Sequence, residues 1–162
     1  MSESQLRQLS ILAGEKLKAN GRWITCAESC TGGGIAKAIT DIAGSSAYFD
    51  RGFVTYSNAA KHDLLGVAEG TLAAHGAVSE AVVREMAVGA LHAARADLAL
   101  SVSGIAGPDG GSEEKPVGTV WFGFADGAGR VLARKVHFTG DRDAVRLQAT
   151  IFALQTAIDE FL

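Results

Sequence analysis

Apolar residues recur every three or four positions in several parts of the chain, which is the spacing of an amphipathic helix. The first such run stretches from Ser4 to Asn20, where the following glycine favours a helix end. Ser79 is the expected cap of a long helix that reaches about Arg95. Asn58 is expected to cap a short helix that Gly66 closes. Together with these, the pattern predicts helices over residues 35–43 and 141–162.

Shorter apolar or β-branched runs lie between these helices and predict strands. They cover residues 22–27, 48–56 and 97–103, followed by a hairpin of 117–125 and 130–138. Residues 104–116 are rich in turn-forming residues and are expected to form a loop. Because strands alternate with helices except at the hairpin, we expect an α/β fold: a three-layer α/β/α sandwich on a mixed, mostly parallel sheet. No repeat or linker divides the chain, so residues 1–162 are interpreted as a single domain.

Composition supports a globular protein and argues against several classes of partner. Hydrophobic residues make up 48% and charged residues 20% of the chain, close to ordinary globular usage. The net charge of −3 lacks the basic character typical of nucleic-acid binding, and no apolar run is long enough to span a membrane. The opening residues lack the apolar core of a secretory signal, and Cys26 and Cys30 are the only cysteines. We therefore expect a cytoplasmic protein without nucleic-acid or membrane partners.

Polar residues follow three predicted strands at the points where those strands end. They are Ser29, Tyr56 and Ser103, each with polar or glycine neighbours. Since ligands of open α/β sheets bind beyond the carboxyl ends of parallel strands, these groups are expected to share one crevice. Ser29 precedes a glycine-rich helix start whose N–H groups can stabilise negative charge, the arrangement that acyl transfer needs. The alternative is that Ser29 or Thr31 simply caps the helix.

A nucleophilic serine needs a base, and Lys61 is the best candidate. The four histidines are scattered and none falls at a predicted strand end. Lys61 follows Tyr56 and lies one helical turn into the short helix, and a lysine in a confined pocket can lose its proton near neutral pH. Tyr56 can bring a hydroxyl to the same place. The alternatives are a solvated surface lysine and a core tyrosine.

Two further groups of residues have alternative interpretations. Arg142 and Arg146 are spaced to lie on one helix face, where they can hold a phosphate or pair with Asp141 and Asp143 in solvent. The spacing of the two cysteines, without a nearby histidine, does not indicate a zinc site. Cys30 is a rival nucleophile if the helix start activates its thiol.

Six blocks of sequence resemble the CinA C-terminal-domain family. They are T-C-A-E-S-C-T-G-G-G (25–34), G-F-V-T-Y-S-N-A-A-K (52–61), G-A-V-S-E (76–80), S-G-I-A-G-P-D-G-G (103–111), K-P-V-G-T-V (115–120) and G-D-R-D-A-V-R (140–146). The resemblance implies a three-layer α/β/α fold and hydrolysis of the carboxamide of nicotinamide mononucleotide to nicotinate mononucleotide and ammonia. It also implies that Ser29 is the nucleophile, with Lys61 and Tyr56 as its partners. Ser103 stands where the family usually has threonine.

The resemblance and the residue patterns lead to one mechanistic hypothesis. Lys61 takes the Ser29 proton with Tyr56 assisting, and the helix-start segment Cys30, Thr31, Gly32 and Gly33 receives the oxyanion. The substrate is expected to contact Ser103, Gly104 and an arginine, Arg142 or Arg146. No metal or organic cofactor is expected, and a homodimer is a possible assembly. The alternatives are a non-catalytic nucleotide-binding module and an amidase for another small amide.

Overall fold

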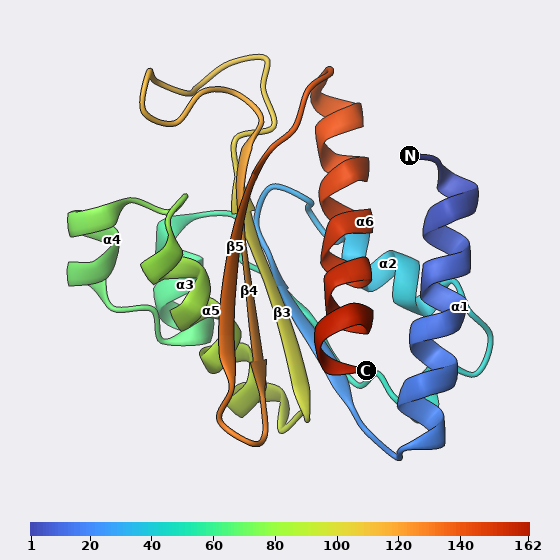
Figure 1. Ribbon diagram of the computed structural model, residues 1–162. Coiled ribbons are helices and arrows are strands. Elements are labelled where there is room, and N and C mark those ends of the chain that lie inside the picture. Colours follow the sequence, from blue (N-terminus) through green and yellow to red (C-terminus); the bar gives the residue numbers. More distant parts are fainter.

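A five-stranded sheet runs through the middle of the molecule with helices on both sides (Figure 1). The computed structural model describes all of residues 1–162. The strands lie side by side in the order β2-β1-β3-β4-β5. In chain order they are β1 (Ile24–Glu28), β2 (Phe53–Val54), β3 (Leu98–Gly104), β4 (Thr119–Asp126) and β5 (Val131–His137).

Strand directions make the sheet mixed. β1 pairs in parallel with both β2 and β3, whereas β4 pairs antiparallel with β3 and β5. Consequently β5 runs in the same direction as β3, and β4 alone runs the opposite way. The mixed, mostly parallel sheet expected from the alternation of elements is confirmed. It brings the carboxyl ends of β1, β2 and β3 to one edge, where a site is expected.

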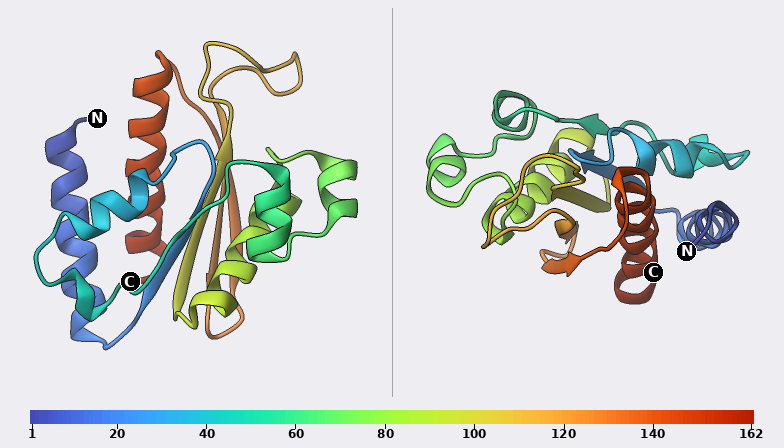
Figure 2. Two further views of the ribbon diagram at one scale, coloured as in Figure 1. Left: turned by 180° about the vertical axis from the view of Figure 1, so that it is seen from behind. Right: turned by 90° about the horizontal axis from the view of Figure 1, so that it is seen from above.

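Helices cover the two faces of the sheet in two separate groups (Figures 1 and 2). One face carries α1, α2 and α6, and the other carries α3, α4 and α5. This arrangement confirms the predicted three-layer sandwich. The helices are α1 (Glu3–Ala19), α2 (Gly34–Thr40), α3 (Asn58–Leu65), α4 (Glu69–His75), α5 (Glu80–Ala94) and α6 (Arg142–Phe161), with a short 3₁₀ turn at Ser45–Ala47.

Alternating side chains of β3 build two different cores. Leu98, Leu100 and Val102 join the larger apolar cluster beneath α1, α2 and α6. Ala99 faces the smaller cluster beneath α5, and Ser101 Oγ donates to the carbonyl of Val83 in that helix at 2.6 Å. Because successive side chains of a strand point to opposite faces, β3 presents large residues to one layer and small residues to the other. The small residues let α5 lie close against the sheet.

The packing of α3 against α5 depends on a glycine. A Cβ atom built on Gly89 of α5 would lie 1.9 Å from the carbonyl oxygen of Leu65, the last residue of α3. No side chain fits in that space. The close approach fixes the end of α3, and this helix carries Lys61.

Two expectations about the region before α3 were wrong in detail. The strand expected over residues 48–56 is only two residues long, with Phe49 forming an isolated bridge to Ile24. The cap of α3 is Ser57 rather than Asn58, since Ser57 Oγ accepts from the amide of Ala60 at 3.0 Å. Gly66 closes this helix in the left-handed conformation, as expected.

The helix α4 was not predicted. Its seven residues have no side-chain cap of their own, and Glu85 of α5 instead accepts from the amide of Ala68 at 2.9 Å.

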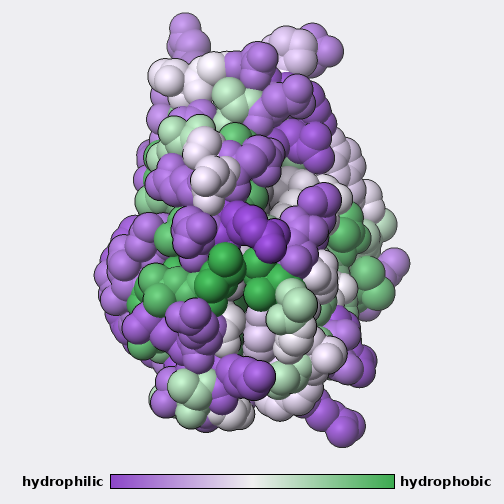
Figure 3. Space-filling model, turned by 90° about the vertical axis from the view of Figure 1, so that its right-hand side faces the viewer, coloured by the Kyte–Doolittle hydropathy of each residue, from purple (hydrophilic) through white to green (hydrophobic).

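The outer side of α1 is shown in Figure 3, where apolar residues gather across the middle of the face between hydrophilic regions above and below. None of the helices combines the length and apolar character needed to cross a membrane.

Candidate active site

The segment after β1 is held from beneath by a buried carboxylate. Glu28 is fully buried, and its two oxygens accept from the hydroxyl of Thr31 at 2.6 Å and from the amides of Ile35 at 2.8 Å and Ala36 at 3.0 Å. The acidic side chain thereby satisfies first-turn donors of α2, where negative charge is favoured. The alternative that Ser29 or Thr31 caps this helix is wrong, because the cap residue is Gly33 and the first-turn amides of Ile35 and Ala36 donate to Glu28.

A cavity of about 230 Å³ lies beyond the carboxyl ends of β1 and β3. Its wall brings together residues from three of the predicted strand ends, from the start of α3 and from α6. The residues expected there from the sequence are Ser29, Cys30, Tyr56, Lys61, Ser103, Gly104 and Arg142, and Asn58, Ala77, Val78 and Ala106 complete the lining. No histidine lines this cavity.

Lys61 is buried and points at Ser29. Only 1% of Lys61 is exposed, so the alternative of a solvated surface lysine is wrong. Its Nζ lies 3.1 Å from Ser29 Oγ, 3.0 Å from the carbonyl oxygen of Thr55 and 3.3 Å from that of Tyr56. Burial disfavours the charged ammonium and lowers the pKa of Lys61 from its ordinary value.

These contacts can also be made by the neutral amine that the lowered pKa of Lys61 favours. A neutral lysine has two N–H donors and one lone pair, and the carbonyls of Thr55 and Tyr56 can take both donors. The lone pair then faces the hydroxyl of Ser29, which can donate its proton. The arrangement is that of a nucleophile and its base within hydrogen-bond distance.

The turn that follows Ser29 offers unused backbone donors. The amide of Gly32 donates to the carbonyl of Ser29 at 3.0 Å, and Gly34 donates to Thr31 at 3.0 Å. The amides of Cys30, Thr31 and Gly33 donate to no group in the structure. The amides of Cys30 and Thr31, which follow the serine directly, are therefore available to donate to an anionic oxygen.

Tyr56 contributes to the cavity through both its backbone carbonyl and its phenol. Its carbonyl accepts from Lys61, whereas its side chain is 61% exposed. The phenol oxygen accepts from Arg142 Nη2 at 3.2 Å, and Arg142 Nη1 donates to the carbonyl of Gly107 at 2.8 Å. These two contacts hold the Arg142 guanidinium over the rim of the cavity.

Arg146 lies on the other side of the segment that carries Ser29. Its Nε donates to the carbonyl of Cys30 at 3.1 Å and its Nη2 to that of Thr31 at 3.4 Å. Arg146 and Thr31 line a groove that is separate from the Ser29 cavity. Gly32 and Gly33, which were expected to contact the substrate, line neither the groove nor the cavity. The alternative that the arginine pair forms salt bridges with Asp141 and Asp143 is wrong, because Asp141 instead caps α6 through the amide of Ala144.

The two cysteines are unpaired and buried. Burial raises the pKa of the Cys30 thiol to about 11, and burial together with Glu28 raises that of Cys26 well above its ordinary value. A thiol that keeps its proton at neutral pH is a poor nucleophile. This observation argues against Cys30 as the rival of Ser29.

A comparison with protein families matches residues 6–161 to the CinA C-terminal domain. The chain belongs to this family. Among its relatives, the nicotinamide-nucleotide amidohydrolase PncC of Enterobacter agglomerans is 74% identical over the whole of this chain and 99% of its own length. The PncC of Escherichia coli K12 is 67% identical over the whole of this chain and 98% of its own.

Solved structures of competence/damage-inducible proteins share the fold. The competence/damage inducible protein CihA of Agrobacterium tumefaciens superposes with a TM-score of 0.94 at 46% identity, over 96% of this chain and 94% of that one. A competence damage-inducible protein A from Klebsiella pneumoniae gives a TM-score of 0.92 at 42% identity, over 96% of each chain.

Sequence reasoning overlooked several parts of the CinA-domain site. Asn58 lines the cavity rather than capping α3, and Ala77 and Val78 reach it from the connection between α4 and α5. Ala77 and Val78 belong to the G-A-V-S-E block, yet nothing in the local pattern of that block indicated a binding role. Glu28 was visible next to Ser29, but its role depends on folding α2 back over it.

Proposed function

We propose that this protein hydrolyses the carboxamide of nicotinamide mononucleotide, releasing nicotinate mononucleotide and ammonia. One observation carries the proposal: a buried lysine amine lies 3.1 Å from Ser29 Oγ in a cavity wall. Support comes from the 74% identity, over the whole chain, to a protein named as a nicotinamide-nucleotide amidohydrolase. A product of this kind would return to the synthesis of pyridine dinucleotides.

Lys61 acts as general base in the first proposed step. Ser29 Oγ forms a bond to the carboxamide carbon, the serine proton passes to Lys61 Nζ, and the carbonyl π electrons move to oxygen. The free amides of Cys30 and Thr31 are the nearest backbone donors in sequence to the attacking oxygen, and they receive the resulting anion. Burial serves this step because it lowers the pKa of Lys61 and so favours the neutral amine.

Lys61 then acts as general acid. The tetrahedral intermediate collapses, the C–N bond breaks, and Lys61 returns its proton to the departing nitrogen, which leaves as ammonia. Water next attacks the acyl-serine while Lys61 takes a water proton. Collapse of the second intermediate breaks the Ser29 ester, and the proton on Lys61 returns to Ser29 Oγ. These steps require no metal or organic cofactor.

Arg142 is proposed to hold the substrate phosphate. Its guanidinium lies on the cavity rim, has no carboxylate partner, and is held by Tyr56 and the carbonyl of Gly107. Charge-assisted bonds from a planar guanidinium suit a phosphate oxygen pair. In this proposal Tyr56 positions Arg142 with its phenol and Lys61 with its carbonyl, while Ser103 and Gly104 contact the substrate from the end of β3.

Ammonia release from nicotinamide mononucleotide tests the proposal. Wild type is expected to turn over, and Ser29→Ala to lose activity while still binding the mononucleotide. Ser46→Ala, which changes an exposed serine that does not line the cavity, is the matched control and should keep the activity of wild type. A Ser29→Ala variant as active as wild type would refute the assignment. Binding without ammonia release in wild type would favour the non-catalytic module, and a preference for nicotinamide or its riboside would favour another amide substrate.

Residues 1–162 are proposed to act as one amidohydrolase domain, because every helix packs either on the one sheet or on a helix that contacts it. The unpaired, buried cysteines support the expected cytoplasmic location, where thiols stay reduced. A homodimer stays a prediction that sedimentation would test.

A further inference from the structure

The two arginines of the G-D-R-D-A-V-R block have different surroundings. Arg142 lies on the rim of the Ser29 cavity, whereas Arg146 lines a groove of about 460 Å³ that shares no residue with that cavity. Lys61 approaches Ser29 from the α3 layer, and Arg146 approaches the following residues from the α6 layer. The turn after β1 thus lies between a lysine on one side and an arginine on the other.

The bonds of Arg146 fix the direction of one peptide group. In a trans peptide the C=O and N–H bonds point in opposite directions. The carbonyl of Cys30 points at Arg146 Nε, so the N–H of the same peptide, that of Thr31, points away from Arg146. This N–H has no acceptor in the structure.

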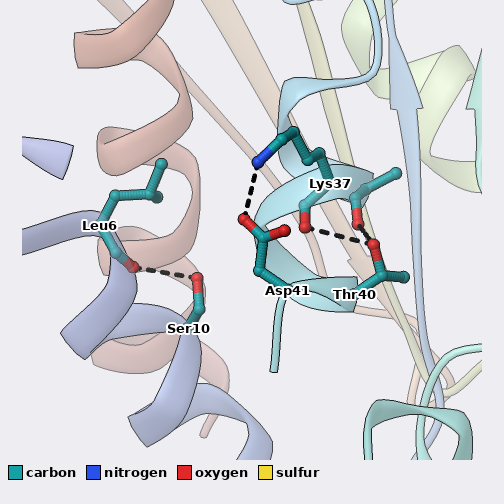
Figure 4. Close-up of polar contacts among 6 residues, drawn as sticks. Leu6, Ser10, Lys37, Thr40 and Asp41 are labelled. Atoms are coloured by element: carbon teal, nitrogen blue, oxygen red, sulfur yellow. Dashed lines mark hydrogen bonds and ion pairs between the residues drawn. The ribbon is translucent and has the colours of Figure 1, made fainter. Parts of the chain in front are cut away.

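A charged donor on the carbonyl also strengthens the N–H as a donor. Hydrogen bonds in series polarise one another, and a guanidinium is a stronger donor than a neutral group. Arg146 has no carboxylate partner that would neutralise it. The other cation of the groove, Lys37, is paired with Asp41 at 2.9 Å (Figure 4), so it does not compete for the same carbonyls.

We infer that Arg146 is a positioning residue for the reaction: it holds the Cys30–Thr31 peptide so that the Thr31 N–H receives the oxyanion. The inference rests on the proposed function. Glu28 restrains the same segment from the sheet side through the Thr31 hydroxyl. With both restraints the donor is preorganised before substrate binds, the condition under which oxyanion donors are most effective.

Kinetics of Arg146→Ala and Arg142→Ala on nicotinamide mononucleotide and its riboside test the inference. Arg146→Ala is expected to lower kcat by about 100-fold, because a misdirected donor acts mainly on the transition state. Its KM should stay near that of wild type for both substrates. Arg142→Ala should instead raise KM for the mononucleotide and leave the riboside unaffected. An Arg146→Ala variant with unchanged kcat, or with a raised KM alone, would overturn the inference.

An aldehyde analogue of the mononucleotide, which adds to Ser29 to form a tetrahedral adduct, separates positioning from general stability. Its inhibition constant should weaken in Arg146→Ala by a factor similar to the loss in kcat. Binding of nicotinate mononucleotide, which forms no adduct, should not change. Equal binding of the aldehyde by variant and wild type would contradict the proposed role.

Two controls keep the outcomes separate. If Arg146→Ala does not fold, Arg146→Met decides by the same measurements, since methionine keeps an unbranched apolar stem but has no donor for either carbonyl. A folded Arg146→Met with the kcat and aldehyde binding of wild type would then overturn the inference. Absence of ammonia release from wild type would mean that the proposed function has failed, whereas turnover that depends on Ser29 but not on Arg146 would mean that this inference alone has failed.

Discussion

Replacing Glu28 with glutamine tests whether one buried carboxylate holds the active-site segment. Oε1 of Glu28 accepts from the Thr31 hydroxyl and the Ile35 amide, and Oε2 accepts from the Ala36 amide and the Cys26 thiol. A glutamine keeps one accepting oxygen and presents an NH₂ group in place of the other. In its better orientation the variant still leaves the Ala36 amide facing a donor.

The cost follows from these contacts. A buried amide without an acceptor costs about 1–3 kcal/mol, and loss of negative charge at a helix N-terminus costs about 0.3–2 kcal/mol. We therefore expect Glu28→Gln to lower the free energy of unfolding by about 2–4 kcal/mol. Since 1 kcal/mol corresponds to about 2–4 °C for a chain of this size, the melting temperature should fall by roughly 10 °C.

Equilibrium unfolding in urea measures this difference, with Asp41→Asn as the matched control. Asp41 lies at the other end of the same helix, where it forms an exposed ion pair with Lys37 (Figure 4). The control should change stability by about 0.5 kcal/mol or less. If Glu28→Gln were as stable as wild type, the carboxylate would not be the anchor of α2, and the reasoning about the segment after β1 would be wrong.

Three further predictions concern the base, the thiol and the packing of α3. Because burial lowers the pKa of Lys61 from 10.5, kcat/KM should rise with pH through that lowered pKa and level off above it. Lys61→Arg, which stays protonated, should lose this rise together with the activity. Cys30→Ala should keep most of the activity. In wild type the Cys30 thiol should resist alkylation at neutral pH, since burial raises its pKa to about 11. Rapid alkylation that abolishes activity would contradict this prediction. Gly89→Ala should destabilise the protein in urea unfolding, because its Cβ would lie 1.9 Å from the Leu65 carbonyl oxygen. The control Gly70→Ala, with open space around it, should stabilise the protein by about 0.4–1 kcal/mol. Equal effects of the two substitutions would refute the packing argument.

The sequence alone determined the elements that carry their own signals. The long helices α1, α5 and α6 follow from periodic apolar residues, and Ser79 caps α5 by accepting from the amide of Val82, as expected. Alternation of strands and helices was enough for the layered fold. Ser29 was identified as a candidate because residues at strand ends meet at one edge of a parallel sheet, and Lys61 because it lies one turn into the helix that follows the second strand end.

Tertiary structure decided what depends on atoms distant along the chain. Lys61 is buried because Gly89 lets α3 lie against α5, and its lowered pKa is a consequence of that burial. The α4 helix lacks its own cap and uses Glu85, so no local pattern predicted it. Arg142 and Arg146 have the same spacing signal, yet one reaches the cavity rim and the other the carbonyls behind it. Propensity and periodicity act over a few residues, whereas burial, capping from another element and the direction of a peptide group are set by three-dimensional contacts.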